Sequence, residues 1–167
     1  MPLDEFQRFL DVNTVGTFLV TREASIAMRT REPRAVLQSL PNRGTTRGAI
    51  VNLGSGSSIV ATPGVLPYTT SKHAVLGLSK NSALDNAPHG IRVNCVCPTW
   101  TDTPMVRAAM NGVEGLSKFI KAAVPIGRIA IPEEVADTII FLCSPRSSYV
   151  TGCGFIVDGG ATLSALR

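Results

Sequence analysis

The sequence has little of what marks disordered or membrane proteins. Aromatic residues make up 5% of the 167 residues and charged residues 17%, whereas hydrophobic residues make up 44%. This balance favours a globular protein over a disordered one. The longest uninterrupted apolar run, Ile139 to Cys143, is far shorter than the roughly 20 residues of a membrane span. The start, MPLDEFQRFL, carries acidic residues and no apolar segment. We therefore expect no signal peptide, no membrane partner and a cytoplasmic location.

The cysteines are few and poorly spaced for a metal site. They are Cys95, Cys97, Cys143 and Cys153, and no histidine or further cysteine stands at ligand spacing from the first two. A zinc site is therefore not expected. Cys95 and Cys97 are two residues apart in an apolar run, so on a strand both side chains would face the same side. We expect buried free thiols that pack as small hydrophobic groups.

Strong clustering of positive charge is also missing. The net charge is +4, and the densest basic stretches, RTREPR (29–34) and NRGTTRG (42–48), contain no aromatic residues. This pattern favours a solvated loop over a nucleic-acid patch. We expect residues 33–48 to form that loop, and we expect no nucleic-acid partner.

Hydrophobic periodicity indicates alternating strands and helices in one domain, residues 1–167. The first helix is expected over 4–31, with Asp4 and Gln7 at capping-box spacing. A strand that ends in a Gly/Ser turn is then expected within 48–55, a second strand at 91–98, and a final strand and turn at 154–160. Helices are expected at 66–90, from 104, and at 132–144. The order β–α–β–α–α–β after the first helix predicts an α/β fold with a parallel sheet and helices packed on it.

The stretch PYTTSKHAV (67–75) places Tyr68 four residues before Lys72, so on a helix both would lie on one face. A nearby ammonium ion stabilises a phenolate, which allows a tyrosine to exchange a proton with an alcohol or an alkoxide. Ser55 follows the first expected strand and could donate a hydrogen bond to a carbonyl oxygen. Tyrosine and lysine also occur four apart by chance on many surface helices, so this pair alone does not establish catalysis.

Several further motifs accompany the pair. They are DVNTVGTF (11–18), IVNLGSGSS (50–58), GIRVNCVCPTWTDTPM (90–105) and PIGRIAIPEEVADTIIFLCSPRSSYVTGCGFIVDGG (125–160). With PYTTSKHAV, this set resembles the short-chain dehydrogenase/reductase family over nearly the whole chain and in the expected order. The resemblance implies a partial doubly wound Rossmann-type sheet in a three-layer α/β/α arrangement.

The resemblance also implies catalytic roles. Ser55 stands 13 residues before Tyr68, as the substrate-orienting serine of the family does. Tyr68 would be the proton donor and acceptor, and Lys72 would stabilise its phenolate and bind the nicotinamide ribose. Asn13 matches the asparagine that holds a water in a proton relay from the lysine. Its alternative is a helix asparagine that bonds a neighbouring carbonyl.

The segment from Pro98 to Thr103 resembles the family's loop over the nicotinamide. The family usually has Pro-Gly there, whereas this chain has Pro98-Thr99, and threonine adopts a positive φ less readily than glycine. Thr101 and Thr103 stand where family members contact the carboxamide or nearby phosphates. Trp100 either lines the substrate pocket or packs in the interior, and the sequence favours neither.

A glycine-rich turn after the first strand, which in the family cradles the cofactor pyrophosphate, is not evident. The glycine-dense stretches 54–58 and 151–154 do not fit that position. Three strands are expected, against seven in the family. The chain therefore resembles the C-terminal two-thirds of such an enzyme, with the N-terminal strands missing.

Two functions remain open. The first is the catalytic portion of an oxidoreductase that transfers hydride between NAD or NADP and a small carbonyl or alcohol substrate, with Tyr68 as acid/base. The second is a truncated, non-catalytic remnant that acts only in folding or oligomerisation with related chains. In the family, helices matching 4–31 and 66–88 pair between subunits, which implies a homodimer or homotetramer.

Overall fold

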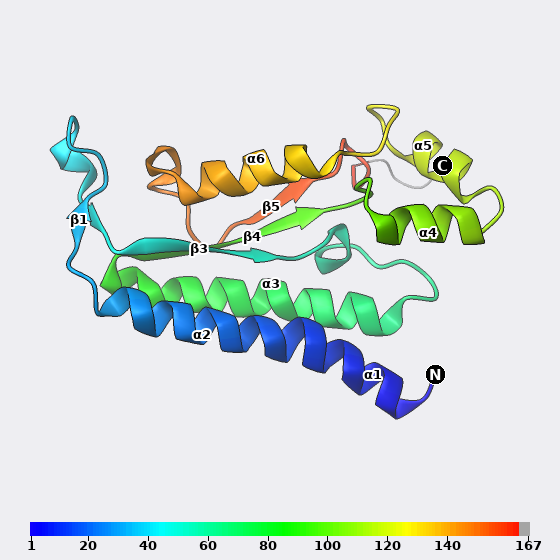
Figure 1. The fold of residues 1–167 in the computed structure, drawn as a ribbon, viewed down its shortest axis with the longest axis horizontal. Helices are drawn as coiled ribbons and strands as arrows, with labels where there is room; N and C mark the ends of the chain where they lie inside the picture. Colours follow the sequence, from blue (N-terminus) through cyan, green and yellow to red (C-terminus); the bar gives the residue numbers. More distant parts are fainter. Residues whose placement is uncertain (164–167) are drawn as a thin grey trace.

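In the computed structural model, which describes residues 1–163, three parallel strands form a sheet between two layers of helices (Figure 1). The strands are β3 (Gly48–Leu53), β4 (Ile91–Pro98) and β5 (Gly154–Val157), in the order β3-β4-β5. Ile50 lies opposite Val93 across the first pair, and Cys95 opposite Gly154 across the second. The predicted parallel α/β architecture is confirmed.

Two long helical rods cover one face of the sheet, and α6 (Pro132–Cys143) covers the other (Figure 1). The first rod consists of α1 (Leu3–Phe9), a π-helical turn (Leu10–Val15) and α2 (Gly16–Arg29). The second rod is α3 (Leu66–Asn86). The buried face of α3 carries mostly small residues at a spacing of four, which lets the helix approach the sheet closely; they are Pro67, Ser71, Val75, Ser79 and Ala83.

The core lies on both sides of the sheet. On the side of the two rods, Ile50, Ala83 and Val93 belong to one buried cluster. On the other side, Val96 packs with Val135 and Leu142 of α6. No helix among residues 1–163 is long and apolar enough to cross a membrane.

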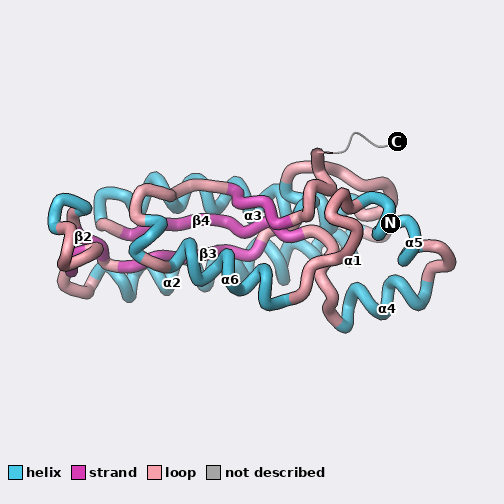
Figure 2. Tube along the Cα trace, turned by 90° about the horizontal axis from the view of Figure 1, so that it is seen from above, coloured by secondary structure: helices cyan, strands magenta, loops and turns pink. Residues whose placement is uncertain are grey.

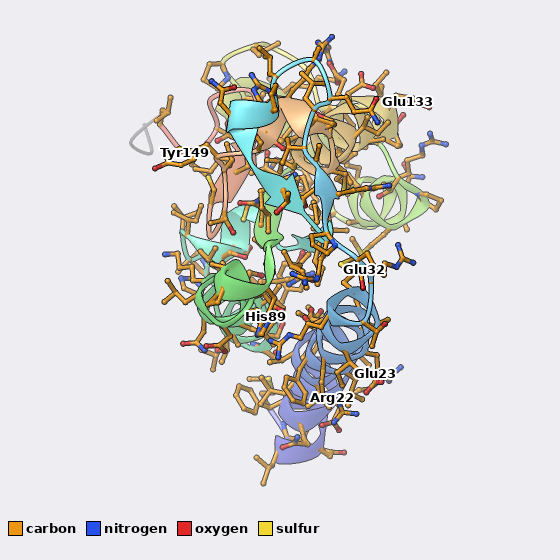
Figure 3. The ribbon with its side chains drawn as sticks, turned by 90° about the vertical axis from the view of Figure 1, so that its left-hand side faces the viewer. Arg22, Glu23, Glu32, His89, Glu133 and Tyr149 are labelled. Carbon is orange, nitrogen blue, oxygen red and sulfur yellow. The ribbon has the colours of Figure 1, made fainter. Side chains whose placement is uncertain are left out.

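The two ends of the sheet differ. Helices α4 (Pro104–Gly112) and α5 (Leu116–Ala123) lie beyond the carboxyl ends of the strands (Figures 1 and 2). At the opposite end, β1 (Arg34–Ala35) and β2 (Thr45–Thr46) form a small antiparallel pair. Figure 3 looks onto that end, with Glu32 and His89 labelled. The loop expected over 33–48 thus contains a short strand pair, and α5 was not expected.

The start of the first rod also differs from the sequence prediction. Pro2 occupies the cap position, and no side chain caps the helix. The Gln7 amide instead donates a hydrogen bond of 2.8 Å to the Asp11 carboxylate one turn later. The capping box predicted for Asp4 and Gln7 is therefore wrong, because the helix already begins at Leu3.

Candidate active site

The candidate site lies at the carboxyl ends of β3 and β4, where parallel sheets of this kind bind their ligands. After Leu53, the chain turns through Gly54 and Ser55 into a short 3-10 turn, Gly56–Ser58. After β4, the segment 98–103 leads into α4. The first turns of α3 complete the site from the side of the two rods.

Hydrogen bonds within the turn hold Ser55 in place and leave its hydroxyl proton free to donate a hydrogen bond. It is buried, and its Oγ accepts a hydrogen bond of 3.1 Å from the Ser57 backbone N–H. Its own backbone N–H donates to Ser58 Oγ at 3.1 Å. Among residues 1–163, the Ser55 hydroxyl proton has no acceptor, so it can donate to a substrate oxygen.

Ser58 links this turn to α3. Its hydroxyl accepts from Ser55 and donates to the Lys72 backbone carbonyl at 2.8 Å. Ser58 is almost fully buried, and a buried hydroxyl that both accepts and donates holds its neighbours firmly. The backbone of Ser55 is therefore tied to the helical turn that carries Lys72.

Lys72 lies between the end of β3 and Tyr68. Its Nζ donates to the Leu53 carbonyl at 3.0 Å and lies 5.8 Å from the centre of the Tyr68 ring. Burial lowers the pKa of Lys72 from its ordinary value of 10.5, and the nearby thiols Cys95 and Cys97 act in the opposite direction. Tyr68 and Lys72 thus lie on one face of the helix, as predicted, and the ammonium lies close to the phenol ring.

The two thiols of β4 lie near Lys72. Cys95 and Cys97 are fully buried and free, and their sulfur atoms are 3.8 Å apart. The hydrogen bond to Cys97 and burial raise the pKa of the Cys95 thiol, so it stays protonated. The expectation of buried free thiols on one side of a strand is confirmed for this pair. Among residues 1–163, no cluster of three metal-ligating side chains occurs.

Asn13 lies in the π-helical turn and contacts α3 between Tyr68 and Lys72. Its Nδ2 donates to Ser71 Oγ at 3.0 Å, and Ser71 Oγ donates to the Tyr68 carbonyl at 2.8 Å. The Asn13 side chain thus bonds a hydroxyl across two helices rather than a neighbouring carbonyl. π-Helical turns are frequent at functional sites. Phe9, just before this turn, contacts the Tyr68 ring edge-on at 6.5 Å.

The segment 98–103 is fixed to its surroundings without unusual backbone. No non-glycine residue among 1–163 has a positive φ, so Thr99 keeps an ordinary conformation. Its backbone N–H donates to the Val157 carbonyl at 3.2 Å, and its carbonyl accepts from Thr101 Oγ1 at 3.3 Å. Thr103 caps α4 through a bond of 3.4 Å from Val106.

Trp100 lines a cavity that the catalytic candidates do not line. It lines a cavity of about 140 Å³ together with Val124, Ile126 and Val157. None of Asn13, Ser55, Tyr68 or Lys72 lines this cavity. Ser58 and Ser71, which the sequence did not single out, connect these four residues to one another. Substrate contact by Trp100 stays a prediction.

Comparison with known proteins gives consistent matches. A family model described as enoyl-(acyl carrier protein) reductase matches residues 1–162. The short-chain dehydrogenase fogB of Aspergillus ruber is 71% identical over 166 residues, which is 99% of this chain and 61% of the relative. The short-chain dehydrogenase virB of Hypocrea virens is 58% identical over 96% of this chain and 64% of its own length. The chain thus spans less than two thirds of these relatives.

Solved structures agree with the fold. A gluconate 5-dehydrogenase from Burkholderia cenocepacia, solved with NADP and tartrate, has a TM-score of 0.84 at 28% identity and covers 99% of this chain. An aldohexose dehydrogenase from Thermoplasma acidophilum has a TM-score of 0.81 at 36% identity. The match covers 59% of the first structure and 63% of the second.

Proposed function

The chain belongs to the short-chain dehydrogenase/reductase family, and we propose that it carries the acid/base and substrate-orienting groups of an NAD(P)-dependent oxidoreductase. The reaction is the interconversion of a carbonyl and an alcohol. The observation that supports this most directly is the position of the Lys72 ammonium, which joins the end of β3 to the Tyr68 ring. Relatives named as dehydrogenases support the same reaction type.

Each group has a distinct role in the proposed reaction. A bound NAD(P) would supply or accept the hydride at its nicotinamide ring. The Ser55 hydroxyl donates a hydrogen bond to the substrate oxygen and holds it in place. The Tyr68 hydroxyl gives a proton to the forming alkoxide, and Lys72 stabilises the phenolate that remains. We assign to Asn13 the ordering of a water that returns the proton from solvent by way of Lys72.

The residues at hand fit the nicotinamide end of the cofactor. Lys72 and Tyr68 offer donors for the ribose, and we propose that the segment with Pro98, Thr99, Thr101 and Thr103 covers the nicotinamide. The turn 54–58 does not offer an open phosphate cradle. A Cβ on Gly54 would lie 2.7 Å from Cys95 Sγ, so the chain's own side chains already fill the space beside it. We propose that the pyrophosphate is held by a segment outside residues 1–163.

We propose that the protein forms a homodimer or a homotetramer. Exposed apolar side chains lie along the first rod and on α3, and we call this set the rod surface: Val12, Val15, Phe18, Val20, Ile26 and Leu84. Gly77 on α3 is a second reason to expect association. A glycine inside a helix costs about 0.5–1 kcal/mol relative to alanine, yet nothing lies within 4 Å of a Cβ added there. Close approach of another copy would account for both features.

A non-catalytic role is the second candidate. It is favoured by the rod surface, whose exposed apolar side chains a partner chain could cover. A chain of this kind would associate with full-length relatives and turn over no substrate. Association without activity, also in the fused protein described below, would support this second candidate.

The test uses a fused protein. The N-terminal segment of the Aspergillus ruber relative that lies outside the match is joined to residues 1–167, and NAD(P)H consumption is measured with a panel of ketones, aldehydes and sugars. We expect carbonyl-dependent consumption. Ser55→Ala should lower kcat by about 10²-fold, because an oriented donor is lost. Ser57→Ala is the control, since it keeps the backbone N–H that bonds Ser55. Equal rates for both variants would contradict the assignment of Ser55.

A further inference from the structure

Thr99 and Gly56 meet where the two loops of the site come together. Gly56 directly follows Ser55 and is buried, and the atom nearest to a Cβ built on it is Thr99 Cγ2. That separation is far below the roughly 3.5–4.0 Å at which carbon atoms touch. The next two atoms, Thr99 Cβ and the Pro98 carbonyl oxygen, lie at 3.7 and 3.9 Å. A single methyl group therefore occupies the space that any side chain at position 56 would need.

We propose that Thr99 is a positioning residue for Ser55 and acts through this methyl contact with Gly56. The inference rests on the proposed function, because it assigns Ser55 to the reacting oxygen. In this chain the larger residue stands in the loop after β4, and the glycine stands in the Ser55 turn. The two residues thus form a complementary pair, which we call the 56/99 pair.

Both partners are anchored, so the contact has a defined effect. Thr99 is held to the end of β5 by its hydrogen bond to Val157. On the other side, Ser55 is held by Ser58, whose hydroxyl also bonds the Lys72 carbonyl. The turn at Ser55 therefore lies between two fixed points, the Thr99 methyl and the Ser58 hydroxyl. Pushing the turn away from Thr99 moves Ser55 relative to Tyr68 and Lys72.

The consequence for the reaction follows from the size of that shift. An alanine at position 56 needs more than about 1 Å of additional separation to reach ordinary contact with the Thr99 methyl. Misplacement of a reacting group by about 1 Å can lower a rate by about 10²-fold. Thr99→Ser removes the offending methyl and keeps the hydroxyl. The methyl introduced by Gly56→Ala can then occupy the vacated space, because the remaining neighbours lie at contact distance.

The experiment is a double-mutant cycle in the fused protein, with Gly56→Ala, Thr99→Ser and the double variant. Gly56→Ala should lower kcat by about 10²-fold and leave the KM for NAD(P)H within about threefold. Thr99→Ser should cost a few-fold, and the double variant should recover at least tenfold over Gly56→Ala. Gly112→Ala is the control, since nothing lies within 4 Å of its added Cβ. Additive losses would overturn the proposal. A rise in the KM for NAD(P)H with unchanged kcat would also overturn the proposal. That result would mean that the segment 98–103 had moved and that the Ser55 turn had stayed in place.

The same cycle in thermal unfolding of residues 1–167 needs no activity. Gly56→Ala should lower the midpoint, and Thr99→Ser in the double variant should restore most of it. If the unsubstituted fused protein turns over no substrate, the proposed function fails, and the unfolding cycle still decides whether the 56/99 pair exists. Independent midpoints in that cycle would refute the pair itself.

Discussion

Lys72→Met separates the catalytic role of Lys72 from any structural one. The side chain is partly buried, and burial lowers its pKa, so its charge is unfavourable to the folded state. Methionine keeps the apolar stem and removes the charge. The lost hydrogen bond to the Leu53 carbonyl can be replaced by water, because Leu53 is 52% exposed. We therefore expect the thermal midpoint at pH 7 to stay unchanged or to rise slightly.

The expected loss in activity follows from the position of the charge. At 5.8 Å from the Tyr68 ring centre, an ammonium stabilises a phenolate by about 3 kcal/mol at an effective dielectric constant of about 20. Solvent screening at this partly exposed side chain reduces the figure to about 1–3 kcal/mol. That range corresponds to a fall in rate of about 5- to 150-fold. Without the ammonium the phenolate is a stronger base, so the ascending, low-pH limb of the alcohol-oxidation pH profile should move to higher pH.

The assay measures kcat against pH and the free energy of unfolding against pH for both proteins. Below the lowered pKa of Lys72, the burial cost is fully present. Between that pKa and 10.5, the unfolded chain binds more protons than the folded one, so wild-type stability rises with pH. Lys72→Met should lack this rise. A variant that loses stability and activity together, with an unchanged pH profile, would show that Lys72 is only structural.

Three further predictions concern binding, association and acid stability. Residues 1–167 alone should show no saturable NAD(P)H binding at millimolar concentration in calorimetry, because we propose that the pyrophosphate contacts, which supply much of the binding energy, lie outside this segment; micromolar binding would contradict this. Leu84→Lys on the rod surface should give a monomer by sedimentation, whereas Ile140→Lys on α6, which is also exposed, should leave the oligomer intact. If both variants formed the same oligomer, the rod surface would not be the interface. The pKa of Glu134 is lowered to about 2 by hydrogen bonds from Arg128 and the Ile131 N–H, so its stabilising effect is present above pH 4.5 and is lost as the pH falls toward about 2. Glu134→Gln should therefore be less stable than wild type at pH 7 in thermal unfolding and equal to it near pH 2, and a constant difference would contradict the assignment.

The strands and the long helices were predictable because each has a clear local signal. The β-rich runs before Ser55 and before Pro98 end at turn residues, and α3 ends at Asn86, shortly before Pro88 and Gly90. α5 was not predicted because Gly112 and Gly115 stand before it, and glycine disfavours a helix. Gly115 in fact takes a positive φ of 77° and precedes the helix as its cap. The π-helical turn at Asn13 has no composition signal, because it depends on packing against α3.

The candidate site was predictable only where its residues are close in sequence. A spacing of four places Tyr68 and Lys72 on one helix face without further information. The contacts that fix Ser55 join distant segments: Ser58 bonds Lys72, and Gly56 meets Thr99. Such contacts depend on which loops the parallel sheet brings to one end, and the spacing along the chain does not contain that information.

The most direct test of the central claim compares the two tyrosines of the chain. Tyr68→Phe in the fused protein removes only the hydroxyl assigned to proton transfer, and Tyr149→Phe makes the same change on a side chain that is fully exposed (Figure 3). With NAD(P)H and the best carbonyl substrate at saturation, we expect Tyr68→Phe to lower kcat by about 10² or more and Tyr149→Phe to leave it unchanged. Near-normal turnover by Tyr68→Phe would contradict the assignment of Tyr68 as the acid/base.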